Sequence, residues 1–268
     1  MLSKTTHKKL IKHLQKSGAR ILHIDIETMA NLAWVWGKYE QNVIAFEQES
    51  FLLSVSWKWH GEKEVYFKCL ADFKGYKPRT TDDKALTKFI AEELFENADI
   101  IVAHNGISFD MKVIYGRMFK HGIKPPTPAK FFDTKVAAKK HFRMNSNKLD
   151  DIGEFTGLGR KVKHEGWDMW MGCYNGEKKH WDLMKKYNKQ DVLLMERIYT
   201  AMLPYMTQHP NVLMYSSQGF GCRLCGSKKL VKAKRRYTTS GYRQQYQCKD
   251  CGGYTTDKKT FPTTEMRA

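Results

Sequence analysis

Four of the chain's six cysteines stand in two closely spaced pairs near the C-terminal end. Cys222 with Cys225, and Cys248 with Cys251, each have the spacing CxxC, and residues 226–247 separate the pairs. In a chain without an export signal, such pairs are more often metal ligands than disulfides. Four thiolates suit one tetrahedral Zn²⁺ in a closed structural site, whose binding would make so small a module fold. The cysteines therefore predict a zinc ribbon with one structural Zn²⁺.

The residues between the two pairs are typical of a hairpin that turns at Ser240 and Gly241. A glycine follows each pair, Gly226 and Gly252, which fits a tight turn that points backbone N–H groups at sulfur. Residues 207–221 have the composition of a linker, although residues 212–215 could add a strand. We therefore expect one large domain over residues 1–210, and a linker with the zinc ribbon over residues 211–268.

The chain is strongly basic, with 46 Lys and Arg, 28 Asp and Glu and a formal charge of +18. Half of this excess lies after residue 216. Such an excess favours nucleic acid as a partner, although a solubilising surface is the alternative. In the ribbon, cations alternate with tyrosines, which fits phosphate contact with base stacking; the cations are Lys234, Arg235, Arg236 and Arg243. Docking to another protein is the other use that a ribbon could have.

The rest of the chain has the patterns of an α/β domain. Strands are expected at residues 20–26, 33–36, 51–59 and 64–68, before strands and helices alternate. The alternation comprises a helix at 84–97, a strand at 99–103, a helix at 108–121, a strand from 131, and helices at 134–142 and 178–206. This order predicts a mixed sheet flanked by helices. Residues 7–17 have the pattern of a short amphipathic helix, and residues 164–170 that of a loop without an assigned role.

No apolar run of the chain approaches the ~20 residues that span a bilayer. The Lys-rich first twenty residues do not have the pattern of a secretory signal. We expect a cytoplasmic protein without membrane contact.

The first acidic motif is Asp25-Ile26-Glu27-Thr28. Side chains alternate along a strand, so Asp25 and Glu27 point to the same side. Each carboxylate raises the pKa of the other unless a cation lies between them, and hard oxygen ligands suit Mg²⁺ or Mn²⁺. Two solvated acids at the end of a strand are the simpler interpretation of this motif alone.

Two further motifs follow downstream. Residues 105–110 run from Asn105 through Phe109 to Asp110, between a predicted strand and a predicted helix. Asp110 would then lie at the carboxyl end of a strand, where open sheets build sites, although it could simply cap the helix. Tyr187 and Asp191 are four residues apart on a helix and share one face. A tyrosine in the core beside an exposed acid is the alternative there.

In this order, the motifs DxE, NxxxFD and YxxxD resemble those of the DEDD 3′–5′ exonuclease superfamily, in the branch with tyrosine in its last motif. The resemblance covers residues 20–205 and is closest to the proofreading domains of family B DNA polymerases and to stand-alone exonucleases of phages and bacteria. Residues 131–135 and 148–161 are also similar to segments of that group. The resemblance implies a ribonuclease H-like fold and hydrolysis of phosphodiester bonds with two Mg²⁺ or Mn²⁺ ions.

Carried over residue by residue, the resemblance makes Asp25, Glu27, Asp110 and Asp191 the metal ligands. Tyr187 would orient the attacking water, because a phenol with a pKa near 10 is a poor base at neutral pH. Single-stranded DNA is the expected substrate, with replication or repair proteins as further candidate partners.

Three residues beside the motif acids are candidates for substrate contact. Met29 and Phe109 could stack on bases, although core packing is the expected role of Phe109. Asn105 could contact the substrate or only hold its loop. Among the other polar residues, Asp133 is expected to cap a turn and His104 to form a hydrogen bond at the end of a strand.

Other functions remain open on the same scaffold. An RNase or a structure-specific endonuclease would use the same four acids. A non-catalytic nucleic-acid-binding protein that recruits others is disfavoured by the presence of all four acids and the tyrosine.

Overall fold

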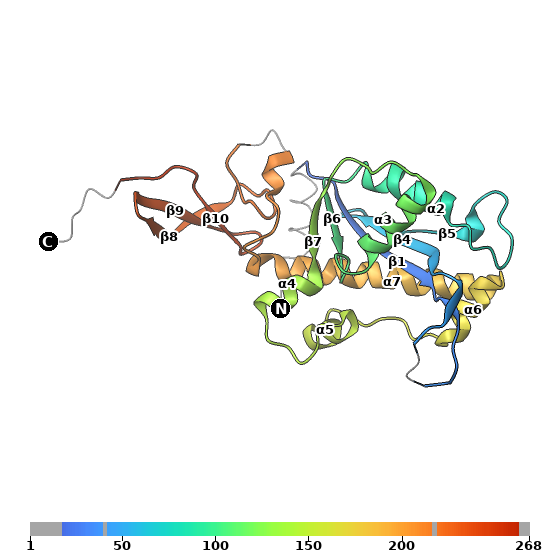
Figure 1. The fold of residues 1–268 in the computed structure, drawn as a ribbon. Coiled ribbons are helices and arrows are strands. Elements are labelled where there is room, and N and C mark those ends of the chain that lie inside the picture. Colours follow the sequence, from blue (N-terminus) through green and yellow to red (C-terminus); the bar gives the residue numbers. More distant parts are fainter. Residues whose placement is uncertain (1–17, 40–41, 216–218, 263–268) are drawn as a thin grey trace.

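A computed structural model describes residues 18–39, 42–215 and 219–262 (Figure 1). The helix predicted at residues 7–17 lies outside this part of the chain. Among the described residues, no helix combines the length and the apolar character needed to cross a bilayer.

A five-stranded mixed sheet forms the centre of the larger part of the chain, as the sequence predicted. Its central strand β1 (Ile21–Met29) pairs antiparallel with β4 (Phe51–Trp59) and parallel with β6 (Ile100–Ala103). The sheet is completed by β5 (Tyr66–Cys69), antiparallel to β4, and β7 (Lys130–Asp133), parallel to β6. The strand order is therefore β5-β4-β1-β6-β7.

Helices cover both faces of the sheet (Figure 1). One face carries α2 (Lys84–Phe89), its π-helical continuation (Ile90–Phe95) and α3 (Asp110–His121). The other face carries the long helix α7 (Lys178–Met202), which crosses β1 and β4. Because side chains alternate along β1, Leu22, Ile24 and Ile26 are buried in the apolar cluster of α2 and α3, and His23, Asp25 and Glu27 face α7.

Shorter helices surround α7 and complete the larger part of the chain. Three of them contact it: α4 (Thr134–His141), α5 (Leu149–Thr156) and α6 (Trp167–Tyr174). A 3₁₀ turn (Leu203–Tyr205) follows α7, because Pro204 lacks the backbone N–H that a continued helix would use.

Three sequence predictions require correction. Residues 164–170 are not all loop, because α6 begins at Trp167. Residues 212–215 form a 3₁₀ helix (Val212–Tyr215), so they add no strand. The strand predicted at residues 33–36 is β2 (Leu32–Trp34), which pairs with β3 (Ala45–Gln48) in a separate hairpin and not in the main sheet. These errors share one cause: short apolar runs fit a strand, a helix or a loop until their neighbours are known.

The C-terminal part contains a three-stranded antiparallel sheet in the order β10-β9-β8. β8 (Leu230–Thr238) and β9 (Gly241–Cys248) form a hairpin whose turn falls where the sequence predicted it, and β10 (Tyr254–Thr256) pairs with β9. The four paired cysteines gather at one end of this sheet. They belong to the same apolar cluster as the C-terminal half of α7, so the sheet packs directly on the end of that helix.

A buried charged network attaches α7 to the sheet. Glu196 of α7 pairs with Lys58, and its other oxygen lies 3.2 Å from His60 Nδ1. His60 in turn lies 2.9 Å from His23 Nε2. Burial raises the pKa of Glu196, but the hydrogen bond from His60 and the neighbouring charges outweigh it and hold the pKa below its usual value. The two histidines and Glu196 are close enough to share a metal ion, but the Lys58 ammonium already supplies the positive charge that Glu196 requires.

Glu196→Ala should lower the free energy of unfolding by about 3–5 kcal/mol, because it leaves the buried Lys58 ammonium without its partner. Urea unfolding followed by circular dichroism measures this change. Lys58→Met with Glu196→Leu should recover most of the loss. The control is Glu92→Ala, which removes an exposed pair with Lys88 and should cost under about 1 kcal/mol. Equal losses for Glu196→Ala and Glu92→Ala would contradict the role of the network.

Candidate functional site

Three carboxylates from two distant parts of the chain meet on the α7 face of the sheet. Asp25 and Glu27 come from β1, and Asp191 comes from the middle of α7. Each offers an oxygen to a group whose members all lie within 4.8 Å of one another. The spacing DxE places the first two on one side of the strand, and only the packing of α7 brings the third.

Asp110 joins this group from the start of α3. Its Oδ1 accepts a hydrogen bond of 3.3 Å from the backbone N–H of Ile26, between the two acids of β1. Asp110 is buried in the first turn of α3, close enough to Asp25 to raise the pKa of that residue. The structure thus brings together all four acids of the sequence motifs.

Asn188 fixes the position of Asp25. Its Nδ2 donates to Asp25 Oδ2 at 2.5 Å and to the backbone carbonyl of Asp25 at 3.3 Å. Ser54 of β4 donates to Asn188 Oδ1 at 3.4 Å. Asn188 lies next to Tyr187 in the sequence, but nothing in its sequence context distinguishes it from a surface asparagine, so its role could not be predicted from the sequence.

Burial raises the pKa of each of the four acids, and the charges of the other site acids raise the pKa values of Asp25 and Glu27 further. Burial and then the charges of Asp191, Asp110 and Glu27 hold the pKa of Asp25 well above its usual value. Burial and then Asp191 raise the pKa of Glu27 to about 8, and burial raises the pKa of Asp110 to about 6. The pKa of Asp191 is raised by burial as well, although Lys161 opposes the shift. Because ionising these buried acids costs free energy, the site favours the binding of a cation, which offsets that cost.

Lys161 supplies part of that positive charge. Its Nζ lies 2.6 Å from Asp191 Oδ2 and 4.8 Å from the centre of the Tyr187 ring. Burial opposes its charged form, but the neighbouring Asp191 holds the pKa of Lys161 above its usual value. Lys161 ends one of the family-like segments of the sequence, yet in a run of basic residues its role could not be distinguished from that of a solvated lysine.

Tyr187 is buried beside Asp191 and between two aromatic side chains. Its ring packs edge-on against His164 at 4.8 Å and Trp170 at 6.2 Å between ring centres. Burial and then the charge of Asp191 raise the pKa of Tyr187 above its usual value. The hydroxyl therefore stays protonated at neutral pH and can donate a hydrogen bond.

One buried oxygen of the site is left for a ligand. Among the described residues, Asp191 Oδ1 is buried and has no hydrogen-bond partner. Unpaired buried carboxylate oxygens are costly, and a divalent cation among hard oxygen donors removes that cost. The residues present therefore fit Mg²⁺ or Mn²⁺.

A shallow groove of about 550 Å³ opens beside the acids. Its lining comes from the end of β1, from Ser50, and from the start of α6 with the residues before it; the lining side chains include Thr28, Met29, His164, Trp167 and Trp170. Met29 is 4% exposed and contributes mainly to the core, whereas Trp167 is 53% exposed. The segment to which the sequence assigned no role thus forms one wall of the groove next to Tyr187.

The candidate contacts of the second motif differ in exposure. Asn105 has φ of 71°, a conformation that asparagine tolerates, and its side chain accepts a hydrogen bond from Ser108. Asp133 accepts from the N–H of Asn105 and caps α4, so its expected capping role is confirmed. His104 bonds to Thr134 and to the carbonyl of Asn147, as expected for a structural histidine. The prediction that Phe109 packs in the core was wrong, because its side chain is 44% exposed at the start of α3.

The four paired cysteines form a second candidate metal site. All are buried and unoxidised, with Sγ atoms of Cys222 and Cys251 at 3.5 Å and those of Cys225 and Cys248 at 3.7 Å. Tetrahedral Zn²⁺ with Zn–S bonds of about 2.3 Å would space its sulfurs about 3.8 Å apart. Gly226 and Gly252 both have φ of 76°, which permits the two matching turns. The cluster is compatible with zinc.

The ribbon cations lie on the exposed hairpin β8–β9. Arg235 lies over the Tyr242 ring, 4.5 Å from its centre, and Arg243 donates to Thr260. Arg236 and Arg243 are directly opposite each other across the two strands. These residues are on the surface, but their exposure alone does not identify a ligand.

Comparison with known proteins identifies a family for the larger part of the chain. A family model described as the RNase_H superfamily matches residues 49–203. The matched span contains Asp110, Tyr187 and Asp191, whereas β1 and the cysteine cluster lie outside it. No curated protein matches the chain.

The metal-free protein should lose thermal stability as the pH rises from about 5 to about 8. Folding raises the pKa of Asp110 to about 6 and of Glu27 to about 8, so in this range the unfolded state releases protons that the folded state still holds. The loss from Asp110 is complete near pH 6, and the loss from Glu27 continues to about pH 8. Glu27→Gln should raise the melting temperature at pH 8 and flatten the slope, as calorimetry can measure.

Divalent ions other than zinc should be removed by dialysis for this measurement, because a chelator would also strip the cysteine cluster. Glu64→Gln, at an exposed position before β5, is the control and should leave the slope unchanged. A slope that Glu27→Gln does not alter would contradict the electrostatic description of the site.

Proposed function

This chain belongs to the RNase H superfamily, and we propose that it is a metal-dependent 3′–5′ exonuclease that hydrolyses single-stranded DNA. The observation that carries the proposal is the meeting of Asp25, Glu27 and Asp191 within 4.8 Å, with Asp110 bonded to the backbone between the first two. Acids gathered in this way have no evident structural use, because burial and the charges of the neighbouring site acids raise the pKa values of Asp25 and Glu27. They support a site for divalent cations and a phosphodiester.

The four acids would hold two Mg²⁺ or Mn²⁺ ions, which supply the charge that activates water and stabilises the leaving 3′ oxygen. The residues around them provide the geometry. Asn188 holds one oxygen of Asp25 in place, and the N–H of Ile26 holds one oxygen of Asp110. Fixed ligands of this kind need little reorganisation when the substrate binds.

Tyr187 and Lys161 act on the attacking side. A tyrosine with a raised pKa cannot accept a proton at neutral pH, so its role is to donate a hydrogen bond that orients the attacking water. Lys161 neutralises one oxygen of Asp191 and brings an ammonium next to the position of the phosphate. We therefore add Lys161 to the catalytic residues as an electrostatic group.

The groove beside Tyr187 would receive the terminal nucleotide. Trp167 offers an exposed indole there, and His164 and Trp170 close the inner wall. Bases stack on such side chains without sequence preference. Phe109, exposed at the start of α3, is a second stacking candidate, whereas Asn105 supports its loop.

The C-terminal sheet would be a zinc ribbon that aids nucleic-acid binding. Its cysteines fit Zn²⁺ and its exposed cations fit phosphates. We propose the domain division at residues 210 and 211, with the ribbon docked on the end of α7. Six unoxidised cysteines suit a reducing compartment, so the cytoplasm is the proposed location.

An end-labelled single-stranded DNA ladder with Mg²⁺ or Mn²⁺ tests the activity. The wild type should shorten the strand stepwise from its 3′ end, and Asp25→Asn should reduce the rate at least about 10³-fold because the central ligand is lost. Asp182→Asn is the control on the same helix as Asp191, at an exposed pair with Lys178, and should keep full activity.

The pattern of products separates the alternatives. Internal cuts would indicate an endonuclease, and faster shortening of RNA would indicate an RNase. Binding without any product, for wild type and Asp25→Asn alike, would favour a recruitment protein and would end the proposal.

Cys248→Ser should release most of the zinc, measured by elemental analysis, and weaken binding of long DNA. Cleavage of an oligonucleotide of about three nucleotides, too short to reach the ribbon at about 3.4 Å per nucleotide, should persist. Cys69→Ser, outside the cluster, should keep the zinc. Loss of all cleavage in Cys248→Ser with α7 still folded would contradict this division of roles.

A further inference from the structure

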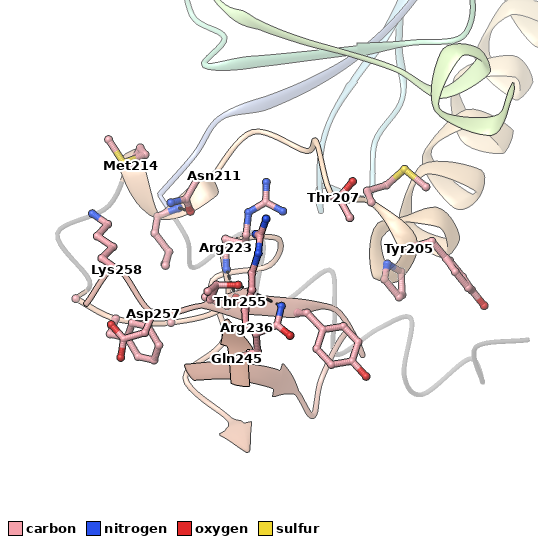
Figure 2. Close-up of a pocket in the computed structure, with 18 residues that line it drawn as sticks. Tyr205, Thr207, Asn211, Met214, Arg223, Arg236, Gln245, Thr255, Asp257 and Lys258 are labelled. Carbon is pink, nitrogen blue, oxygen red and sulfur yellow. Dashed lines mark hydrogen bonds between the residues drawn. The ribbon is translucent and has the colours of Figure 1, made fainter. Parts of the chain in front are cut away.

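A hollow of about 830 Å³ lies between the residues that follow α7 and the concave side of the ribbon (Figure 2). One wall comes from the connecting segment, with Tyr205, Thr207 and Asn211. The other comes from the ribbon, with Arg223 and Arg236 among its residues. The hollow shares no residue with the groove at the carboxylate site.

Two arginines extend into the hollow without a carboxylate partner. Figure 2 shows the side chains of Arg223 and Arg236 pointing in the same direction, toward the connecting segment. Neither is in an ion pair within the described part of the chain. Arg236 also faces Arg243 across the hairpin, where like charges repel. Neighbouring guanidinium groups without a counter-charge are a ready site for phosphate, which each can bind through two N–H groups.

Arg223 is held in place before any ligand arrives. Its backbone carbonyl accepts from Val212 N–H at 3.0 Å, and its own N–H donates to Thr255 Oγ1 at 3.0 Å. One terminal nitrogen of its guanidinium donates to the carbonyl of His209. A cation fixed in this way loses little freedom on binding.

The rest of the lining matches the other parts of a nucleotide. Lys258 adds a third cation, and Asp257 is the one carboxylate that lines the hollow. Apolar side chains surround them with exposed fractions of about half or more: Tyr205, Met214, Phe220 and Tyr254. Cations beside exposed aromatic faces suit a phosphate chain with bases, and an acidic peptide would leave the aromatic faces unused.

A second apolar hollow, of about 920 Å³, continues toward the carboxylate site. It shares Pro204 and Tyr205 with the first hollow and reaches Phe155 of α5 and Leu158 just after that helix. Phe155 is 75% exposed, and α5 is followed within a few residues by Lys161 of the catalytic site. From Asp191 to Tyr205, α7 and its 3₁₀ turn span roughly 20 Å at about 1.5 Å per residue.

We propose that the hollow between the connecting segment and the ribbon is a second binding site for single-stranded nucleic acid, in which Arg223 and Arg236 hold a phosphate. Only the identity of the polymer rests on the proposed function. Since the rim of the hollow at Tyr205 lies roughly 20 Å from Asp191, the phosphate in the hollow would lie several nucleotides from the one at the carboxylates. The site therefore anchors long strands and does not contact the reacting phosphate.

Fluorescence anisotropy without divalent metal tests the site independently of catalysis. The probe is a labelled DNA strand of about 20 nucleotides, much longer than the roughly 20 Å from Asp191 to the rim of the hollow at Tyr205. Arg236→Gln with Arg223→Gln should weaken binding about tenfold and reduce the salt slope of log Kd by about 0.7, the value for the one phosphate that the two arginines hold. Lys74→Gln is the control: it removes one positive charge at an exposed position that lines neither the hollow nor the groove, and it should change both values much less. Arg236→Gln alone avoids the structural contact of Arg223 with His209 and should still weaken binding severalfold.

Competition identifies the ligand. Unlabelled DNA should displace the probe, whereas inorganic phosphate or a poly-glutamate peptide at the same concentration of charge should not. Displacement by phosphate alone would indicate a free-anion site, and displacement by the peptide a protein-docking site; either would overturn the proposal. Equal weakening by Lys74→Gln and Arg236→Gln would overturn it as well, since net charge and not this hollow would then decide binding.

Cleavage adds a second comparison. For a strand of about 20 nucleotides the double variant should raise KM with kcat unchanged, and for one of about three nucleotides neither should change. If the wild type cleaves nothing, the proposed function fails, but the anisotropy result still decides the hollow.

Discussion

The packing of α7 across β1 and β4 is the interaction on which the rest of the structure depends. It places Asp191 beside Asp25 and Glu27, and Asn188 locks the contact by holding both an oxygen and the backbone of Asp25. Further along the same helix, Glu196 pairs with Lys58 in a buried network. A displacement of α7 by one turn, about 5.4 Å, would separate the acids. The buried polar contacts therefore set the register that the carboxylate site requires, since apolar packing alone tolerates small shifts.

The same helix connects the two candidate nucleic-acid sites. Its middle carries the acids, and its C-terminal half shares an apolar cluster with the cysteines of the ribbon. Tyr199 near that end bonds to His209 at 2.7 Å, and the carbonyl of His209 accepts from Arg223 in the hollow. The spacing between the hollow and the acids is thereby built into one rigid element. A ribbon attached only by a flexible linker would bind the strand without a defined distance to the acids.

Electrostatics links the acids to the proposed chemistry. Four carboxylates with raised pKa values and one neutralising lysine make a site that favours added cations at neutral pH. The hollow beside the ribbon presents the opposite case, because Arg223 and Arg236 are in no ion pair among the described residues. One part of the molecule thus favours metal ions and the other favours phosphates. A polyanionic substrate is repelled by a site rich in acids until metal ions reverse the local charge. It therefore needs both the metal ions at the acids and the cations of the hollow.

The sequence by itself determined the mixed sheet, the four acids with Tyr187, and the four cysteines. Each of these depends on local spacing: alternation along a strand brings Asp25 and Glu27 to one face, a four-residue step joins Tyr187 to Asp191, and CxxC pairs close a turn. The tertiary structure alone decided the roles of Asn188, Lys161 and the wall at residues 164–170, and it alone formed the hollow around Arg223 and Arg236. Their partners lie dozens of residues or more away, or across a packed interface, and a single asparagine or lysine has the same sequence context whether it faces an acid or water. Local chemistry is encoded in short patterns, whereas long-range contacts depend on how whole elements pack.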